Sequence, residues 1–515
     1  MRVVTAGQMR DADAAAVADR GDVALMHAAG AAIADAIVAL APDARSFVAF
    51  AGPGNNGGDA YAAFAALAPR IDERLDARVY AVPVGEKSPG RRDAERRAHD
   101  LGVRTLLFPG DAAEARAALV GADVALDAML GTGARPALDA PMRGVVAALA
   151  ASDALVLAID VPTGIDATTG AVGEHAVRAT ATIALGALKI GQLLEPARSR
   201  GGELWLGSLD LDAELAAQCG PRYEALDDAG FLALLPQRAE AGDKRASGAP
   251  LVVAGSERFP GAGVLCSRGA ARAGAGYVTL AAPRDARAAL QAHLVEEMVA
   301  TYDPSDVEGS VAALLDFANK TAAVAIGPGL ATDDDMAAIV RGFLARLDRP
   351  FVADASALRI CGGAHVDVLR GKRCVVTPHA SEFVALDGGG ALGDDERLER
   401  LRAFVSRTGI VTLLKGNTTL IDDGGTIHVN VTGTNALATA GTGDVLTGVI
   451  GTLLAQGLTP VDAARAGAYW HGLAGREAKR ERPIGVVAGD VIDALGRALP
   501  ARRPSRDAPR ARRLS

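Results

Sequence analysis

Three glycine-rich segments in the first half of this chain each follow an apolar, strand-like run. They read FAGPGNNGGDA at 50–60, VALDAMLGTG at 124–133 and LVLAIDVPTGID at 155–166. Backbone N–H groups that open a helix after such a turn suit anionic ligands. In open α/β sheets, ligands bind beyond the carboxyl ends of the strands, where Asp127 and Asp160 stand. The three segments together predict a ligand site at one sheet edge.

The first segment does not fit either common phosphate loop. Gly52, Gly54 and Gly57 satisfy G-x-G-x-x-G, but the next expected strand ends without the acidic residue of a dinucleotide fold. Gly58-Asp59 stands where a P-loop has Lys and Ser or Thr. In a first helical turn, Asp59 would also repel a pyrophosphate placed on that helix end. A tight turn with Asp59 as a capping residue is the alternative interpretation.

Oxygen-bearing side chains recur in the three segments. Asn56, Asp127 and Thr163 offer the hard oxygen ligands that a potassium-like cation takes. An aspartate at a strand end is more often a helix cap. Each residue alone is therefore a weak signal, and the three segments in combination carry the prediction of a cation near the ligand.

NNGGD, DAMLGTG and DVPTGID together resemble the NAD(P)HX epimerase family, as does the opening VVTAGQMRDAD…LMHAAG at 3–30. The resemblance implies a Rossmann-like fold that interconverts the R and S hydrates of NADH and NADPH beside a potassium ion held by Asn56, Asp127 and Thr163. Our hypothesis is that Asp160 is the acid–base group, because epimerisation needs a proton acceptor and donor near one carbon. The positions that the resemblance places against the hydrate are Asn55, Asn56, Gly57, Gly58, Asp59, Gly131, Thr132, Gly133, Ala134, Arg135, Pro136, Ala137 and Asp160.

A second set of motifs lies in the other half. LATAGTGDVLTG at 437–448 leads into the longest apolar run, Val445–Leu458, for which we expect a buried helix. Gly441 and Gly443 would present N–H groups as an anion hole at the start of that helix. Asp444 could take a proton from a hydroxyl while the hole stabilises a transferring phosphoryl group. Such Gly-Thr-Gly-Asp turns also occur as plain helix starts.

Further strand-end loops accompany that motif: AVAIGPGLATDDD at 323–335, VVTPHASEF at 375–383 and LLKGNTTLI at 413–421. A lysine followed by backbone amides and hydroxyls, as at Lys415, suits nucleotide phosphates. His379 is either a ligand contact, beside Glu382, or a core or capping residue. GTGD resembles the ribokinase-like superfamily.

With VVAGSERFPGA at 252–262, these motifs are similar to the ADP/ATP-dependent NAD(P)HX dehydratase family over residues 224 to 498. The resemblance implies that hydrolysis of ADP (or ATP), with magnesium, drives dehydration of the S hydrate, with Asp444 activating its hydroxyl. It places the hydrate against Ala262, Gly329, His379 and Asp444. It places the adenine nucleotide against Lys415, Gly416, Asn417, Thr418, Thr419 and Gly443.

Apolar strand-like runs alternate with Ala-rich helical stretches, and the pattern restarts near residue 249. Runs that are apolar throughout are typical of parallel strands buried on both faces. We therefore predict an α/β chain with a Rossmann-like three-layer domain over 1–220 and a ribokinase-like domain over 224–498. The segment 210–241 lacks strand signals, and the Arg- and Pro-rich tail over 500–515 is predicted to be disordered.

Composition limits the classes of partner that we expect for this protein. A net charge of −8 argues against nucleic acid or an anionic membrane as the main partner. The four cysteines are scattered without a C-x-x-C pair, so reduced thiols are expected. The N-terminus has no signal-peptide pattern. We expect a cytoplasmic homo-oligomer that takes the small molecules NADHX and NADPHX.

Two alternatives stay open at this point. GTGD alone permits a small-molecule kinase of the ribokinase superfamily, and epimerase-like folds also occur as RNA-binding or scaffold modules. The complete NNGGD, DAMLGTG and DVPTGID segments and the acidic charge argue against the second. The chain departs from the family patterns at Ala60-Tyr61, at His27, and at AGDKRASGAP (241–250), where Asp243 and Arg245 replace the outer residues of a His-Lys-Gly lead-in.

Overall fold

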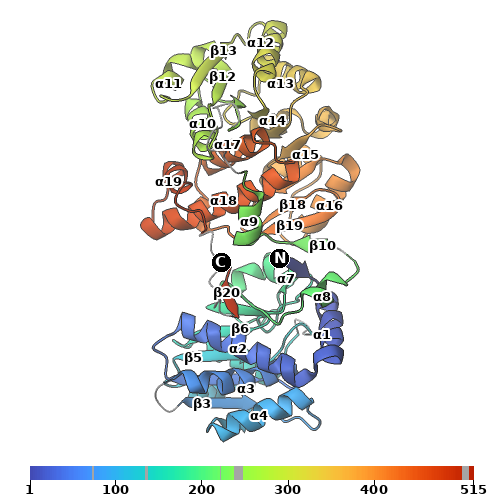
Figure 1. The fold of residues 1–515 in the computed structure, drawn as a ribbon, viewed down its shortest axis with the longest axis vertical. Coiled ribbons are helices and arrows are strands. Elements are labelled where there is room, and N and C mark those ends of the chain that lie inside the picture. Colours follow the sequence, from blue (N-terminus) through green and yellow to red (C-terminus); the bar gives the residue numbers. More distant parts are fainter. Residues whose placement is uncertain (72–74, 134–136, 221, 237–246, 501–509, 515) are drawn as a thin grey trace. The chain divides into compact units, whose positions relative to one another are not determined.

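The computed structural model describes residues 1–71, 75–133, 137–220, 222–236, 247–500 and 510–514 (Figure 1). The chain divides into two compact units, Met1–Tyr223 with the described C-terminal residues, and Glu224–Arg503. The division falls where the sequence predicts the change of domain, between 220 and 224. Each unit is described by itself below.

The first unit is built on a sheet in the order β20-β9-β7-β6-β5-β2-β3-β4. All of its neighbouring strands pair in parallel except β20, which is antiparallel to β9. The elements of this unit are β1 Arg2–Val4, α1 Ala6–Arg20, α2 Asp22–Leu40, β2 Ser46–Ala51, α3 Asn55–Leu67, β3 Asp76–Ala81, α4 Pro89–Asp100, β4 Arg104–Leu107, α5 Ala112–Leu119, β5 Val124–Ala128, α6 Ala140–Ala150, β6 Leu155–Ile159, β7 Ala181–Leu185, β8 Leu188–Lys189, α7 Ile190–Leu193, β9 Glu203–Gly207, α8 Asp212–Ala216 and β20 Ala511–Arg513.

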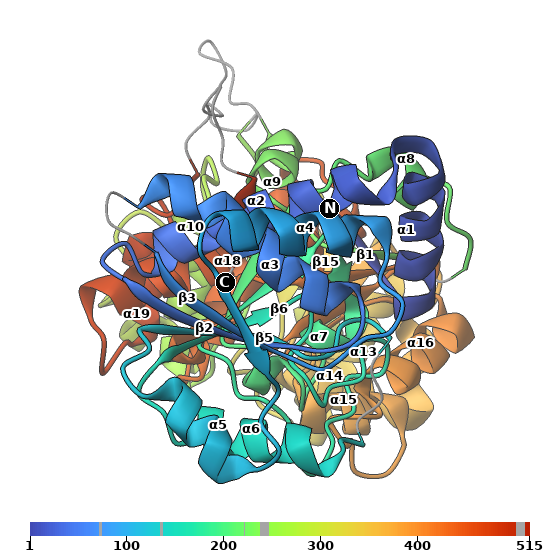
Figure 2. The same cartoon turned by 90° about the horizontal axis from the view of Figure 1, so that it is seen from below.

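Strand β2 lies between two helix layers, with α3 and α4 on one side and α5 and α6 on the other (Figure 2). Phe47 and Ala49 pack with residues of α2 and α3, whereas Val48 and Phe50 pack with residues of α5 and α6. A strand buried on both faces needs apolar residues at successive positions, which explains the run SFVAFA. The predicted three-layer α/β fold is confirmed for this unit.

Helix α2 is, among the described residues, the helix that is long and apolar enough to cross a membrane. It is a core helix here, since Ile33 and Ile37 are buried in the cluster that also holds Phe64 of α3. Gly30 permits this packing, because a Cβ atom there would lie 2.5 Å from the backbone of Ala62. The apolar character of α2 is therefore used inside the fold.

The C-terminal tail is not disordered throughout, and that part of the prediction is wrong. Residues Ala511–Arg513 form β20 at the edge of the first sheet. The N–H groups of Ser208 and Leu514 donate to the carbonyls of Arg510 and Leu204 at 2.8 and 2.7 Å. An arginine-rich strand is tolerated there because only Ala511 must be buried. Residues 501–509 lie outside the described residues.

The second unit contains the strand order β13-β12-β11-β14-β15-β16-β17-β18-β19. The pairing is parallel from β13 to β17 and antiparallel from β17 to β19. The elements are α9 Asp228–Leu234, β11 Pro250–Val253, α10 Pro260–Arg272, β12 Thr279–Pro283, α11 Arg287–Gln291, β13 Met298–Tyr302, α12 Val307–Asn319, β14 Ala323–Ile326, α13 Asp334–Arg346, β15 Phe351–Ala353, α14 Ser356–Ile360, β16 Cys374–Val376, α15 Ala380–Asp387, α16 Arg397–Thr408, β17 Val411–Leu414, β18 Thr419–Asp422, β19 Thr426–Asn430, α17 Thr442–Ala455, α18 Pro460–Glu481 and α19 Ala488–Ala494. At the division of the units, β10 spans Arg222–Glu224, a strand within a segment predicted to have none.

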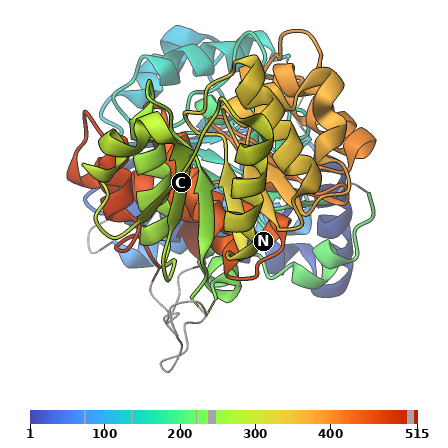
Figure 3. The same cartoon turned by 90° about the horizontal axis from the view of Figure 1, so that it is seen from above.

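The apolar run after GTGD forms the buried helix α17, as predicted. Helix α17 packs with α10 and α18 over one face of the sheet. Helices α12 and α13, drawn in gold in Figure 3, do not belong to this cluster. Gly448 allows α17 to touch α10, because a Cβ atom there would lie 2.0 Å from the carbonyl oxygen of Cys266. This close packing fixes the start of α17, where the GTGD motif lies.

Candidate active sites

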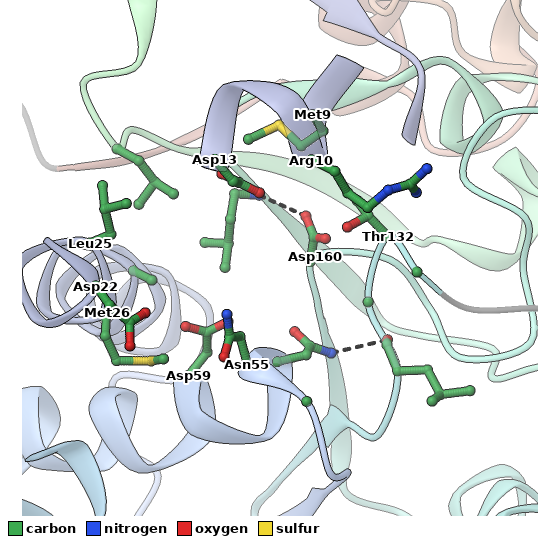
Figure 4. A pocket seen from close by; sticks show the side chains of 18 of the residues that line it. Met9, Arg10, Asp13, Asp22, Leu25, Met26, Asn55, Asp59, Thr132 and Asp160 are labelled. Carbon is green, nitrogen blue, oxygen red and sulfur yellow. Dashed lines mark hydrogen bonds between the residues drawn. The ribbon is translucent and has the colours of Figure 1, made fainter. Parts of the chain in front are cut away.

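A cavity of about 500 Å³ in the first unit gathers many of the predicted residues (Figure 4). It is lined from α1 and α2, from the start of α3, from the loop after β5, and from Asp160 and Lys189. The predicted residues that line it are Asn55, Asn56, Asp59, Gly131, Thr132, Gly133 and Asp160. The expectation that ligands bind beyond the carboxyl ends of the strands, which we call the strand-end rule, therefore pointed to this cavity.

The turn that precedes NNGGD is held by a side chain from another helix rather than by a side-chain N-cap of α3. The guanidinium of Arg91, buried in α4, donates to the carbonyls of Gly52, Pro53 and Gly54 at 2.9, 2.7 and 2.9 Å. Gly52 is required because a Cβ atom would lie 1.7 Å from the Met129 carbonyl oxygen. These contacts fix the turn and leave the N-terminus of α3 facing the cavity.

The other predicted positions of this loop region lie elsewhere. Gly57 and Gly58 do not line the cavity, since a Cβ atom on them would meet the Gly52 carbonyl oxygen at 2.2 Å and the Met26 side chain at 2.9 Å. Ala137 is exposed and is not part of the cavity wall. Ala134, Arg135 and Pro136 lie outside the described residues.

Asp160 sits at a strained turn directly after β6, with φ 67°. A non-glycine residue in the left-handed region costs free energy and is often found at functional sites. Its carboxylate forms an ion pair with Lys189 and accepts the Leu185 N–H at 3.2 Å. Lys189 is 1% exposed and also donates to the Leu185 carbonyl at 2.8 Å. The pair is therefore rigidly held and faces the cavity.

Two further carboxyl groups in this cavity are disposed to hold a proton. Burial raises the pKa of Asp13 to about 6. Burial also raises the pKa of Asp59 well above its usual range, and the charge of Asp160 adds to the effect. One cavity thus combines a lysine-paired carboxylate with two carboxyl groups whose pKa values are raised.

Of the three predicted cation ligands, Asn56 lines the cavity, whereas Asp127 and Thr163 are buried in contact with each other. Thr163 donates its hydroxyl and its backbone N–H to the two oxygens of Asp127 at 2.7 and 2.8 Å. Asn56 donates its amide N–H to the Leu130 carbonyl at 3.0 Å, and its Oδ1 atom is buried without a hydrogen-bond partner. A buried acceptor without a donor is costly unless a cation or water satisfies it. Burial raises the pKa of Asp127 to about 6.

A second cavity, of about 670 Å³, lies within the second unit. Its wall includes polar loops after β16, β17 and β19, the start of α17, and His471 of α18. The predicted residues that line it are His379, Lys415, Gly416, Asn417, Thr419 and Gly443. Thr418 is buried and does not line the cavity. Most residues predicted for the nucleotide thus share one cavity.

Lys415 is surrounded by carboxylates at this site. Its Nζ atom lies 2.8 Å from Asp354 Oδ1 and 3.7 Å from Glu382 Oε2. Burial alone would lower the pKa of Lys415, but these carboxylates raise it. The ammonium group is therefore charged, and a carboxylate lies near it on each of two sides. Gly443 lies next to this lysine, because a Cβ atom there would be 3.5 Å from Lys415 Nζ.

Asp444 follows Gly443 in the first turn of α17. Burial raises its pKa to about 7, and the neighbouring Asp354 contributes to the rise. A carboxylate with a pKa near neutrality is suited to accept a proton during catalysis. Asp444 does not itself line the cavity, whereas Gly443 does. The role of Asp444 as a base stays a prediction, which the raised pKa favours.

His379 combines the two interpretations that the sequence left open. It is the N-cap of α15, where its Nδ1 accepts the Glu382 N–H at 3.3 Å while Glu382 accepts the His379 N–H at 2.9 Å. It also lines the cavity. Ala262 and Gly329 lie against each other, since a Cβ atom on Gly329 would be 2.7 Å from that of Ala262.

Sequence reasoning missed Lys189, Asp354 and His471. Asp354 directly follows β15, so the strand-end rule that located Asp127 would also have located it. Lys189 is a single cation inside the apolar run LGALKIG, a signal for a buried, paired lysine. His471 gives no clear signal in its helix.

The structure is thus a two-unit α/β chain with one large cavity described in each unit. A family model described as NAD(P)H-hydrate dehydratase matches residues 250–497, and one described as YjeF-related protein N-terminus matches residues 22–191.

Curated relatives match both units. The bifunctional NAD(P)H-hydrate repair enzyme of Moorella thermoacetica is 33% identical over 96% of this chain and 96% of its own length. That of Pyrobaculum aerophilum is 34% identical over 92% of this chain and 93% of its own. The chain belongs to the family of bifunctional NAD(P)H-hydrate repair enzymes.

Among solved structures, the ADP/ATP-dependent NAD(P)H-hydrate dehydratase from Bacillus subtilis, co-crystallised with ATP and Mg²⁺, is 28% identical. The match covers 53% of this chain and 97% of that one, with a TM-score of 0.46.

Proposed function

We propose that this chain repairs both epimers of hydrated NADH and NADPH, with epimerisation in the first unit and nucleotide-driven dehydration in the second. The observation that carries the proposal is the pair of cavities, each with a carboxyl group suited to proton transfer on its wall or directly next to it. Asp160 lines the first cavity, and Asp444 follows Gly443, which lines the second. Since dehydration consumes one epimer, the first activity lets the whole damaged pool reach the second. We place the enzyme in the cytoplasm, with its dinucleotide substrates.

In the first unit, Asp160 acts as the acid–base group at the hydroxyl-bearing ring carbon. Lys189 holds the carboxylate in place through their ion pair. Asn55, Asn56, Thr132 and the glycines beside it border the space available to the hydrate. The N-terminus of α3 offers N–H groups to an anionic part of the substrate, on the side that Asp59 does not occupy.

Potassium is the cation that we propose for Asn56, Asp127 and Thr163. The buried, unpartnered Oδ1 of Asn56 supports the fit, because it is an oxygen acceptor beside a buried carboxylate. When bound, the ion would supply a positive charge that fixes these side chains. Asn56 would then link the cation to the cavity, since it lies in both.

In the second unit, the adenine nucleotide binds the cavity that contains Lys415 and Gly443, with its phosphates at Lys415. Magnesium usually binds one or two carboxylates together with substrate phosphates, and Glu382 is suited to that role. Asp444 takes the proton of the hydrate's hydroxyl as that oxygen accepts the terminal phosphoryl group of the nucleotide. The C–O bond then breaks and phosphate leaves with its electron pair. A proton leaves the adjacent carbon, and the ring double bond is restored.

The test supplies a mixture of R and S hydrates of NADH with potassium, magnesium and ADP or ATP, and follows recovery of the reduced-nicotinamide absorbance. Full nucleotide-dependent recovery is expected. With Asp160→Asn, recovery stalls once the S form is spent, at a rate set by spontaneous epimerisation. With Asp444→Ala, nucleotide still binds but neither form is recovered. No recovery by the unaltered protein with either nucleotide contradicts the proposal.

A further inference from the structure

Asp59 is a buried carboxyl group without a partner. It is 9% exposed and lines the cavity of the first unit. Among the described residues, none forms a hydrogen bond or an ion pair with its side chain. The buried cations nearby are bound to other acceptors. In Figure 4 its carboxyl group points into the cavity, on a different side from Asp160. A buried polar group that faces a cavity without a partner is a candidate for ligand contact.

The charged groups around Asp59 come from several elements. Arg10 and Asp13 lie on α1, Asp22 begins α2, Arg91 lies on α4, and Asp160 and Lys189 complete the set. Arg91 is engaged by the loop carbonyls and Glu95, and Lys189 by Asp160 and Leu185. Arg10 is exposed, and the Asp22 carboxylate accepts the Gly90 N–H at 2.6 Å.

This arrangement gives Asp59 three acidic neighbours and leaves each buried cation occupied by another acceptor. The neutral form of Asp59 is therefore favoured, in agreement with the raised pKa of that carboxyl group. Asp160, by contrast, has a lysine in direct contact. Asp59 and the lysine-paired Asp160 thus face one cavity with different charged neighbours.

We propose that Asp59 is the second proton-transferring residue of the epimerase, acting as the acid on one face of the ring carbon while Asp160 acts as the base on the other. The inference rests on the proposed epimerase function and deepens it. An epimerisation that exchanges the hydroxyl needs a proton delivered to the leaving oxygen and a proton removed from the incoming one. Two carboxyl groups on different sides of one cavity supply both.

The step balances without an outside reagent. Asp59 gives its proton to the hydroxyl, the C–O bond breaks, and water leaves as the ring nitrogen's lone pair forms the C=N bond. A water molecule then adds to the opposite face and gives a proton to Asp160. The ring nitrogen regains its lone pair, and no atom is oxidised or reduced. The reverse reaction uses the same residues with their roles exchanged.

The experiment measures conversion of the R hydrate of NADH to the S hydrate by chromatography, without nucleotide, so that the dehydratase is silent. Asp59→Asn should fold, because asparagine has the shape of the neutral acid. We expect its kcat to fall about 100-fold or more with little change in KM. Asp59→Glu should recover part of the loss. Asp93→Asn, which alters a carboxylate outside the cavity on α4, is the matched control and should retain full activity.

Two further readouts separate catalysis from structure. The pH profile of the unaltered enzyme should decline at alkaline pH as Asp59 loses its proton, and Asp59→Asn should lack that decline. In ¹⁸O-water, one solvent oxygen should enter the hydrate per enzymatic turnover, above the spontaneous background. Full activity of Asp59→Asn, or turnover without solvent oxygen, overturns the inference. Failure of the unaltered enzyme to convert the R form instead contradicts the proposed function itself.

Discussion

Lys415 and Asp354 are joined through a short ion pair, with Nζ 2.8 Å from Oδ1. The second oxygen of the same carboxylate accepts the Thr447 hydroxyl at 2.8 Å, so Asp354 fixes the lysine to helix α17. Asp444 lies in the first turn of that helix. Asp354 therefore connects the cation proposed for phosphate with the base proposed for the hydrate.

Replacement of Asp354 by Asn should change the pH dependence of dehydration. The charge of Asp354 contributes to the raised pKa of Asp444, whereas that of Lys415 lowers it. Removal of the Asp354 charge therefore lowers the pKa of Asp444, so the acidic limb of kcat/KM should move to lower pH. Thr447→Val, which removes only the hydroxyl, should leave the limb in place. An unmoved limb in Asp354→Asn would contradict this coupling.

The unaltered dehydratase should lose activity as the pH falls through neutrality. Asp444 acts as a base only when deprotonated, and its pKa is about 7. Below that pH, kcat/KM should fall about tenfold per unit as the protonated form comes to dominate. The profile is measured with the pure S hydrate and saturating nucleotide. A rate that stays constant down to pH 5 would exclude this role for Asp444.

The buried strands were predictable because both of their faces must be apolar. The apolar, strand-like runs at the three glycine-rich segments form the strands Ser46–Ala51, Val124–Ala128 and Leu155–Ile159. By contrast, β13 Met298–Tyr302 is a partly exposed edge strand, and β20 is an arginine-rich strand stabilised by pairing with β9. Strand β13 lacks a continuous buried run because it is partly exposed, and β20 depends on a partner, β9, that lies far away in the sequence.

The sites were predictable to the extent that they use strand ends. Asp127 and Asp160 were found by that rule, and the structure places Asp160 on the wall of the first cavity. Lys189 was missed because its contact with Asp160 depends on the pairing of β8, which composition does not reveal. The neutral state favoured for Asp59 also depends on charges gathered from other elements.

Substitution of Asp160 by Asn should destabilise the first unit as well as stop epimerisation. It removes the ion-pair partner of Lys189, which is 1% exposed. An unpaired buried ammonium group costs about 3 kcal/mol or more. Thermal unfolding should show a lowered midpoint for Asp160→Asn and recovery in the double variant with Lys189→Met, with epimerisation absent from both. A single variant as stable as the unaltered chain would contradict the buried pair.

Deletion of residues 510–515 should lower the stability of the first unit. The deletion removes the hydrogen bonds of β20 to the edge of β9 and exposes the surface that buries Ala511. We expect the unfolding midpoint of this unit to fall by roughly 4 °C per kcal/mol lost. Dehydration, assayed with the S hydrate, should be unaffected, because β20 belongs to the first unit. An unchanged midpoint would mean that the strand adds no stability.

Potassium should stabilise the first unit through Asn56. The Oδ1 atom of Asn56 is buried without a donor, beside Thr163 and Asp127, which are 0% exposed. A bound cation stabilises the folded state in proportion to its occupancy, so the unfolding midpoint should rise with KCl more than with LiCl at equal ionic strength. Asn56→Ala should abolish the difference, whereas Asn55→Ala should keep it. If both salts raise the midpoint of the unaltered chain equally, these oxygens do not form a selective potassium site.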